Sequence, residues 1–141
     1  MYSPIVLDDY VKAVEHCLGL AQGDSSGSRV MAQVLLSAYN GHHFQMDVAE
    51  MSVLDRENYK AVLNVIRGRY ELGLEPHNAV EDGPVRFRDL WSQWECLEIT
   101  ERAKKRCPYC DGGRVYSDTD DEEGCVCENC GGSGRVCGVC R

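Results

Sequence analysis

The sequence predicts a mainly α-helical protein, in which a bundle of about four helices is followed by a small cysteine-rich appendage. Apolar residues recur at helical spacing throughout the first hundred residues. Residues 107–141 contain no Leu, Ile, Met, Phe or Trp, yet they hold seven of the nine cysteines. We therefore expect an all-α domain over residues 1–100, a basic helical extension over 101–106 and a cysteine-rich domain over 107–141.

The first two helices are predicted over residues 4–22 and 29–39. A loop rich in glycine and serine separates them, and Ser28 is the expected N-cap of the second. Asn40 and Gly41 are expected to end this helix with a left-handed residue. The core positions predicted on the two helices are Leu7, Tyr10, Val14, Cys17, Leu18 and Ala21, then Val30, Met31, Val34, Leu35 and Ala38.

Two further helices are predicted after a short helical turn opened by Asp47. The third begins at a Ser52 or Asp55 cap and runs to about Leu72, where Gly73 stops it. After an irregular connection over 75–84, the fourth starts near residues 85–87 and continues through 101–106. The core stripes predicted on these helices are Tyr59, Val62, Leu63, Ile66 and Tyr70, then Phe87, Leu90, Trp91, Trp94 and Leu97.

Charge and hydropathy together indicate the kind of partner and the compartment that we expect for this chain. The net charge is −8, and residues 1–100 contribute eight basic and fifteen acidic side chains. This acidity disfavours nucleic acid as a partner, because neutralising phosphates requires clustered Lys and Arg. No apolar run approaches the roughly 20 residues that span a bilayer, and the N-terminus lacks a signal-peptide pattern. We expect a cytoplasmic protein without a membrane partner.

Paired cysteines predict a structural zinc site in the last third of the chain. Cys107 and Cys110 form one Cys-x-x-Cys pair and Cys127 and Cys130 a second, with 16 residues between the pairs. Two such pairs supply the four thiolates of a tetrahedral zinc site, and in a reducing compartment they bind metal more often than they form disulfides. Zinc binding supplies about 10–16 kcal/mol in comparable peptides, which compensates for the missing apolar core. We expect a zinc finger of the knuckle or ribbon kind, closed to catalysis.

A third pair, Cys137 and Cys140, leaves the number of zinc ions open. Cys125 supplies one further thiolate, and Cys96, a histidine or a second chain could supply another. Alternatively, the third pair replaces one of the first two in a single site, or it is a free or disulfide-bonded chain end. One zinc ion is therefore expected and a second is possible.

The cysteine segments resemble a known zinc-binding repeat. Cys107-Pro-Tyr-Cys-Asp-Gly-Gly and Cys127-Glu-Asn-Cys-Gly-Gly-Ser-Gly resemble the Cys-x-x-Cys-x-Gly-x-Gly repeats of DnaJ-type chaperones. That family carries four repeats in two zinc sites, whereas this chain has two and a truncated third, with the first glycines shifted by one position. The His-Pro-Asp tripeptide of J-domains is absent. The resemblance implies zinc and peptide binding, without co-chaperone activity.

The helical part resembles an uncharacterised small domain of proteobacterial and phage or mobile-element proteins. The resemblance rests on Leu36-Ser-Ala-Tyr-Asn-Gly, Glu75-Pro-His and Leu90-Trp-Ser-Gln-Trp. It implies no established activity. Together with the acidity of the chain, it suggests a phage or mobile-element inhibitor or accessory factor that acts on a host complex.

Three histidines are the best catalytic candidates. His42 and His43 are adjacent, and His77 could join them in space, which would suit a hydrolase or nuclease. They lack a metal-binding spacing such as His-Glu-x-x-His, so a helix-end or surface pair is the simpler interpretation. Cys17 is expected to be a buried apolar residue.

We expect a non-enzymatic, zinc-binding protein-interaction module, because no nucleophile–base pair, phosphate loop or open metal site is visible. Protein is the expected partner, and homo-oligomerisation is possible. The alternative is a zinc-containing nucleic-acid-binding regulator, which would use the basic residues Lys104, Lys105, Arg106, Arg114 and Arg135. The hydrolase that uses the three histidines is a further alternative.

Overall fold

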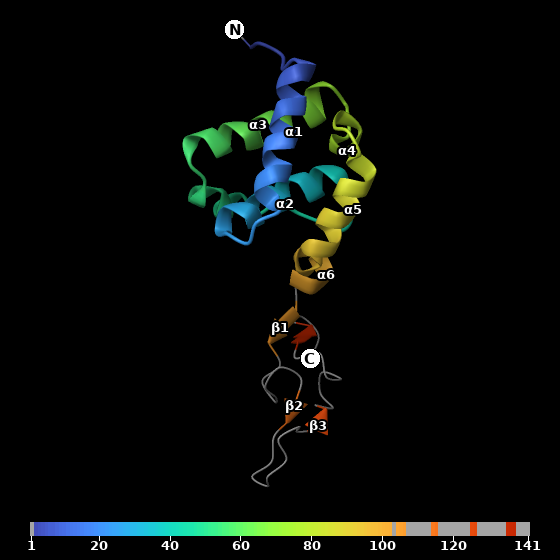
Figure 1. Ribbon diagram of the computed structural model, residues 1–141. Coiled ribbons are helices and arrows are strands. Elements are labelled where there is room, and N and C mark those ends of the chain that lie inside the picture. Colours follow the sequence, from blue (N-terminus) through green and yellow to red (C-terminus); the bar gives the residue numbers. More distant parts are fainter. Residues whose placement is uncertain (1, 103, 107–113, 116–124, 127–134, 138–141) are drawn as a thin grey trace. The chain divides into compact units, whose positions relative to one another are not determined.

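The computed structural model of the protein describes residues 2–102, 104–106, 114–115, 125–126 and 135–137. The chain divides into two compact units, Met1–Ile99 and Thr100–Arg141. The first is entirely helical in its secondary structure, which confirms the prediction of a mainly α-helical protein (Figure 1). None of the helices in the described ranges is both long and apolar enough to cross a bilayer.

The first unit contains the four long helices that the sequence predicts, together with shorter helical turns. The helices are α1 (Leu7–Ala21), α2 (Ser26–Tyr39), α3 (Arg56–Glu71), α4 (Pro76–Ala79) and α5 (Gly83–Gln93), with 3-10 turns η1 (Val48–Val53) and η2 (Glu95–Leu97). In Figure 1, α1 runs across α2, with α3 on one side and α4 and α5 on the other. The short α4 occupies the connection that was expected to be irregular.

Helix α2 forms the centre of the core. Seven consecutive residues, Val30 to Leu36, are buried, and α1, α3, α4, α5 and η1 all contact this helix. A helix that is apolar on nearly all sides belongs in the interior. Both polar atoms of the buried Gln33 amide have a hydrogen-bond partner: its Oε1 accepts a hydrogen bond from the Asp47 N–H at 2.9 Å, and its Nε2 donates to the carboxylate of Glu50.

The caps of α2 differ from those predicted. Ser25, rather than Ser28, is the N-cap, and its Oγ accepts a hydrogen bond from the Ser28 N–H at 3.1 Å. At the other end Asn40 is extended, and its Oδ1 accepts hydrogen bonds from the backbone of His42 and His43. The side chain therefore provides the turn that a left-handed residue was expected to provide.

Helix α3 has the predicted ends but a different buried face. Asp55 caps its start by accepting a hydrogen bond from the Asn58 N–H at 2.8 Å, and Gly73 follows its end with a φ of 63°. Of the predicted stripe only Val62 is buried; the other buried residues are Val65 and Gly68. Leu7 on α1 is likewise exposed, although it was predicted to lie in the core.

The predicted continuous helix through residue 106 is wrong. Helix α5 ends at Gln93, and η2 and α6 (Ile99–Arg102) follow separately. The indole N–H of Trp94 donates to the Ala21 carbonyl at 2.8 Å, which ties the end of α5 to the end of α1. The Trp91 indole N–H donates to the Glu98 carboxylate after the chain has turned. These two tertiary bonds favour the break.

In the residues that the structure describes, the second unit contains four short strands, β1 (Lys104–Arg106), β2 (Arg114–Val115), β3 (Cys125–Val126) and β4 (Arg135–Cys137). Strand β1 pairs antiparallel with β4, so that Arg106 lies opposite Arg135. Strand β2 pairs antiparallel with β3, so that Arg114 lies opposite Val126. Residues 104–106 are therefore a strand, not part of the basic helical extension that the sequence predicted.

Candidate functional site

The outer face of α3 exposes four large residues that were predicted to lie in the core. Tyr59, Leu63, Ile66 and Tyr70 are 45%, 36%, 39% and 87% exposed. They follow one another at intervals of three or four residues, so they form one stripe along the helix. Helix α3 is the green helix at the edge of the first unit in Figure 1. We call these four residues the α3 stripe.

A close contact between α1 and α3 explains why the stripe faces outward. A Cβ atom at Gly68 would lie 2.1 Å from Cδ2 of Tyr10, so only glycine allows the two helices to approach here. The Tyr10 ring is fully buried, and its hydroxyl donates to the Leu74 carbonyl at 2.7 Å. Burial also raises the pKa of Tyr10 to about 12. Because the small side of α3 meets α1, its larger side chains remain outside.

An open groove borders the stripe where α3 meets α2. Its volume is about 410 Å³. At the groove, the Arg69 Nε donates to the Ala38 carbonyl at 3.2 Å, which holds the guanidinium against the end of α2. The residues that line the groove are Val34, Ser37, Ala38, Met46, Ile66, Arg69 and Tyr70. Two members of the α3 stripe are among them, so the groove and the stripe form one continuous apolar surface.

Basic residues lie beside this surface. Helix α3 carries four basic and two acidic side chains, whereas residues 1–99 as a whole carry eight basic and fifteen acidic ones. Arg56 and Lys60 are exposed and form no ion pair with any residue that the structure describes. A strongly acidic unit therefore concentrates half of its cations on the helix that bears the stripe.

Glu71, at the C-terminal end of α3, bonds this helix to the N-terminal segment. Its Oε2 accepts a hydrogen bond from the Arg67 Nε at 2.8 Å, and its Oε1 accepts one from the Ile5 N–H at 2.9 Å. The Arg67 guanidinium also lies 5.4 Å from the ring centre of Tyr2. The bond from Arg67, followed by that from Tyr2, lowers the pKa of Glu71 to about 2.

Two of the three candidate catalytic histidines, His43 and His77, contact different aromatic rings. The His43 ring lies 5.1 Å from Trp91, while the His77 ring lies 4.9 Å from Tyr39, and Tyr39 and Trp91 are themselves 6.3 Å apart. His42 is exposed. Within the described ranges no three His, Cys, Asp or Glu residues are grouped so as to hold a metal ion. The ring contacts of His43 and His77 are packing contacts, and the described residues show no metal-binding group that would support the hydrolase alternative.

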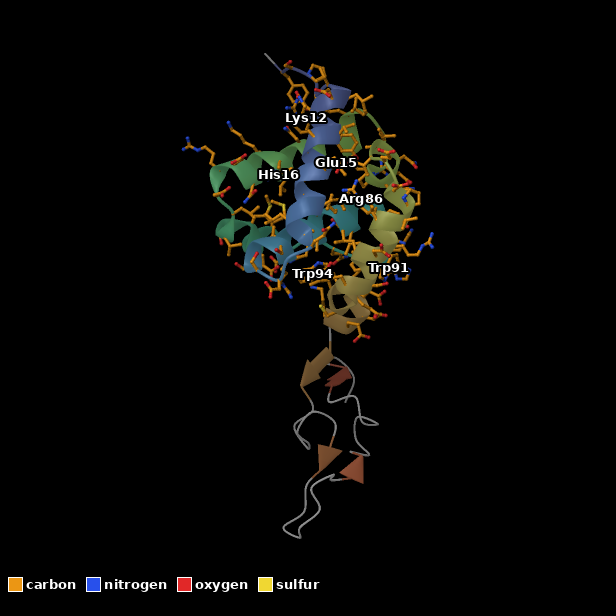
Figure 2. The ribbon with its side chains drawn as sticks, viewed as in Figure 1. Lys12, Glu15, His16, Arg86, Trp91 and Trp94 are labelled. Atoms are coloured by element: carbon orange, nitrogen blue, oxygen red, sulfur yellow. The ribbon has the colours of Figure 1, made fainter. Side chains whose placement is uncertain are left out.

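Polar contacts on the remaining faces of α1 are structural. The two oxygens of Glu15 accept hydrogen bonds from the Arg86 guanidinium, each at 2.8 Å, which joins α1 to α5 and lowers the pKa of Glu15 (Figure 2). On the other side, the His16 Nε2 lies 2.7 Å from the Asn58 Oδ1 of α3. Both contacts fix the helix against which α3 packs.

Residues 11–95 match a protein family of unknown function, DUF7673. This chain belongs to the DUF7673 family. No curated protein and no solved structure matches the chain. The DUF7673 match covers α2, α3, α4 and α5 completely, together with most of α1. It therefore includes the α3 stripe, the groove and the three histidines.

The predicted zinc ligands all follow the part of the chain that matches DUF7673. Cys125 lies in β3 opposite Val115, and Cys137 lies in β4 opposite Lys104. The other predicted ligands lie outside the described residues; they are Cys107, Cys110, Cys127, Cys130 and Cys140.

The two cysteines of the helical unit differ in exposure. Cys17 is fully buried as predicted, and burial raises the pKa of its thiol to about 12. Cys96, which was considered as an additional zinc ligand, is a free and exposed thiol in η2.

Two features of the sequence indicate that the α3 stripe is exposed, although the helical pattern alone predicts that it is buried. Gly68 interrupts the helix with a residue that is unfavourable there by about 1 kcal/mol relative to alanine, which implies a packing reason. The cations Arg56, Lys60 and Arg67 also lie three or four residues from members of the stripe, and a fully buried face would not tolerate them.

Proposed function

We propose that this protein is a non-enzymatic protein-interaction module, in which the α3 stripe and its groove contact the partner and a zinc ion orders the C-terminal segment. The observation that carries the proposal is the exposure of four large side chains, two of them tyrosines, on one helix face. Contiguous apolar surface of this kind marks interaction sites in monomeric proteins, and tyrosine is enriched among residues that dominate binding.

The packing of α3 against α1 also supports the proposal. If the larger side chains of α3 were needed for stability, packing them against α1 would bury more apolar surface than Val62, Val65 and Gly68 do. The close approach at Gly68 prevents this. Leaving apolar residues exposed favours aggregation, so their presence is best explained by a partner that covers them.

Co-purification from a native host tests the interaction. A tagged chain should retain a defined protein complex, and the substitutions Leu63→Asp and Ile66→Asp should release it while the helical content stays unchanged. Val85→Asp is a matched control, because Val85 is 53% exposed and lies on α5. If the α3 variants retain every protein that the unsubstituted chain retains, the proposal is wrong.

Strand pairing supports the zinc part of the proposal. Arg106 is paired with Arg135, and Arg114 is paired with Val126. Segments 107–113 and 127–134 therefore join the same two strand pairs, and each contains one Cys-x-x-Cys pair. Cys107, Cys110, Cys127 and Cys130 would hold the zinc ion, whose bonds to four thiolates would supply the stability that an apolar core supplies elsewhere.

Elemental analysis of the chain, purified under reducing conditions, tests the zinc proposal. We expect about one zinc ion per chain from a four-thiolate site. The double substitution Cys107→Ser and Cys127→Ser should abolish it, without loss of helical signal, because the helical unit has its own core. A chain that carries no zinc above background contradicts this part of the proposal. A content near two requires Cys137 and Cys140 as additional ligands.

A nucleic-acid-binding regulator is the second candidate, because the β1–β4 ladder is strongly basic. Four of its six residues are cations: Lys104, Lys105, Arg106 and Arg135. Binding by such a ladder should weaken steeply with salt, with a slope of about one per phosphate contact. Absence of binding to both DNA and RNA at low salt would exclude this candidate.

A further inference from the structure

We infer that the partner of the α3 stripe is an acidic amphipathic helix, which lays its apolar side into the groove and its carboxylates against the cations of α3. This inference rests on the proposed function and specifies the chemistry of the partner. The shape of the surface suits a helix, because the stripe and the groove run along one α-helix and continue onto its neighbour. In helix-in-groove recognition the docked helix supplies apolar anchors along one face, and the stripe and groove offer the elongated apolar surface that such anchors contact.

The charge around the stripe determines which helix fits. Arg56 lies three residues before Tyr59, Lys60 lies three residues before Leu63, and residues at this spacing are neighbours on a helix surface. Both cations are exposed and lack an ion pair within the part of the chain that the structure describes. A carboxylate of a docked helix would gain an ion pair at either position.

The other edge of the stripe is basic as well. Arg69 lies three residues after Ile66 and lines the groove, and its Nε is bound to the end of α2. Arg67, on the same edge as Lys60, is already paired with Glu71. The cations beside the stripe that lack an ion pair among the described residues thus include Arg56 and Lys60 on one edge, and Arg69 lies on the other edge. A basic helix would meet like charges on both sides.

These charges argue against a second copy of the chain as the occupant. Two α3 helices laid against each other would bring eight basic and only four acidic side chains to one interface. Like charges across an interface are unfavourable, and α3 offers only two carboxylates in compensation.

The acidic segment of this chain is also a poor occupant. Residues 117–123 read Ser-Asp-Thr-Asp-Asp-Glu-Glu, with five acids but no apolar side chain. Such a segment could pair with Arg56 and Lys60 but would leave Leu63 and Ile66 uncovered. Covering the stripe requires apolar anchors and carboxylates on the same helix, and therefore a different partner.

Selection from a display library of random peptides several helical turns long tests the inference with the full chain as bait. Peptides are counter-selected against the Leu63→Asp, Ile66→Asp variant, and a second variant, Tyr70→Ser, guards against loss of folding in the first. We expect the retained peptides to carry apolar residues at helical spacing and an excess of Asp and Glu over Lys and Arg.

Charge reversal then tests the contact itself. Arg56→Glu combined with Lys60→Glu should weaken binding of a selected peptide roughly 3- to 30-fold, as expected for two exposed ion pairs. Arg88→Glu is the matched control, because Arg88 is exposed on α5 and should leave the affinity unchanged. Fluorescence anisotropy of the labelled peptide at two salt concentrations measures both effects.

The outcomes separate the inference from the proposed function. Peptides that need the stripe but are neutral or basic overturn the acidic partner and leave the interaction surface intact. If no peptide depends on the stripe, both are wrong. A dimer that Leu63→Asp converts into a monomer would assign the stripe to a second copy. Sedimentation with phosphatidylserine vesicles that Leu63→Asp abolishes would assign it to a membrane surface. Either result overturns the inference.

Discussion

Replacing Gly68 with alanine should destabilise this protein, although the same replacement stabilises most helices. Alanine is favoured over glycine within a helix by about 1 kcal/mol. At Gly68 the new Cβ would lie 2.1 Å from Cδ2 and 2.3 Å from Cγ of Tyr10. Non-bonded carbon atoms prefer about 3.5–4.0 Å, so α1 and α3 would have to separate or the ring would have to turn.

The Tyr10 ring has little freedom to yield. It is fully buried, and its hydroxyl is bonded to the Leu74 carbonyl at 2.7 Å. Overpacking of this kind costs about 1–3 kcal/mol, and the severity of the overlap places Gly68→Ala at the upper end. After subtracting the helical preference, we expect a loss of about 2 kcal/mol, equivalent to roughly 8–16 °C in Tm for a domain of this size.

Urea denaturation followed by far-UV circular dichroism measures the effect, with Gly19→Ala as the matched control. Gly19 is exposed within α1, and a Cβ there would meet no atom within 4 Å. This control should gain about 0.4–1 kcal/mol. In a Tyr10→Ala background, Gly68→Ala should no longer be harmful. If Gly68→Ala is as stable as the unsubstituted chain, α1 and α3 do not meet at Gly68, and the outward direction of the α3 stripe loses its explanation.

Three further predictions concern other contacts of the helical unit. Because the pKa of Glu71 is lowered from 4.5 to about 2, the ionised carboxylate stabilises the fold fully at neutral pH, and this stabilisation is lost as the pH falls from about 4.5 towards 2. Glu71→Gln should therefore flatten the dependence of the unfolding free energy on pH in this range. An unchanged curve would contradict the bond between Glu71 and Arg67. A Cβ at Gly83 would lie 1.7 Å from the backbone oxygen of His77. Gly83→Ala should therefore lower Tm by more than alanine does at any glycine of α1, α2 or α3. A thermal scan in which Gly83→Ala is as stable as the unsubstituted chain would refute the contact. Iodoacetamide should label Cys96 and not Cys17 in the folded protein, because Cys17 is buried with a thiol pKa of about 12. Mass spectrometry of the digested protein measures the labelling, and a labelled Cys17 would contradict its burial.

The helical class and the positions of the long helices follow from local patterns, and the structure confirms them. Apolar residues at intervals of three and four predicted α1, α2, α3 and α5, and Asp55 and Gly73 mark the ends of α3 as expected. These features depend on neighbours within one or two helical turns. Cys17 was correctly predicted to be buried, because it shares one face of α1 with other apolar residues.

Features that depend on contacts between distant residues were not predictable in this way. The end of α5 is tied by the Trp94 indole to the Ala21 carbonyl, more than seventy positions earlier in the chain, so periodicity alone extended the helix too far. Likewise, the pairing of Arg106 with Arg135 makes residues 104–106 a strand, although their composition suits a helix end.

The sequence alone determined that α3 is an amphipathic helix with a stripe of large apolar residues, and two of its Cys-x-x-Cys pairs predict a zinc site. Only the tertiary structure decided which side of α3 is buried. Periodicity shows that the apolar side chains share a face, but it does not show what that face meets. The close approach of Tyr10 to Gly68 turns the small side of α3 inward, and the residues that resemble a core thereby remain exposed, where we propose that a partner binds.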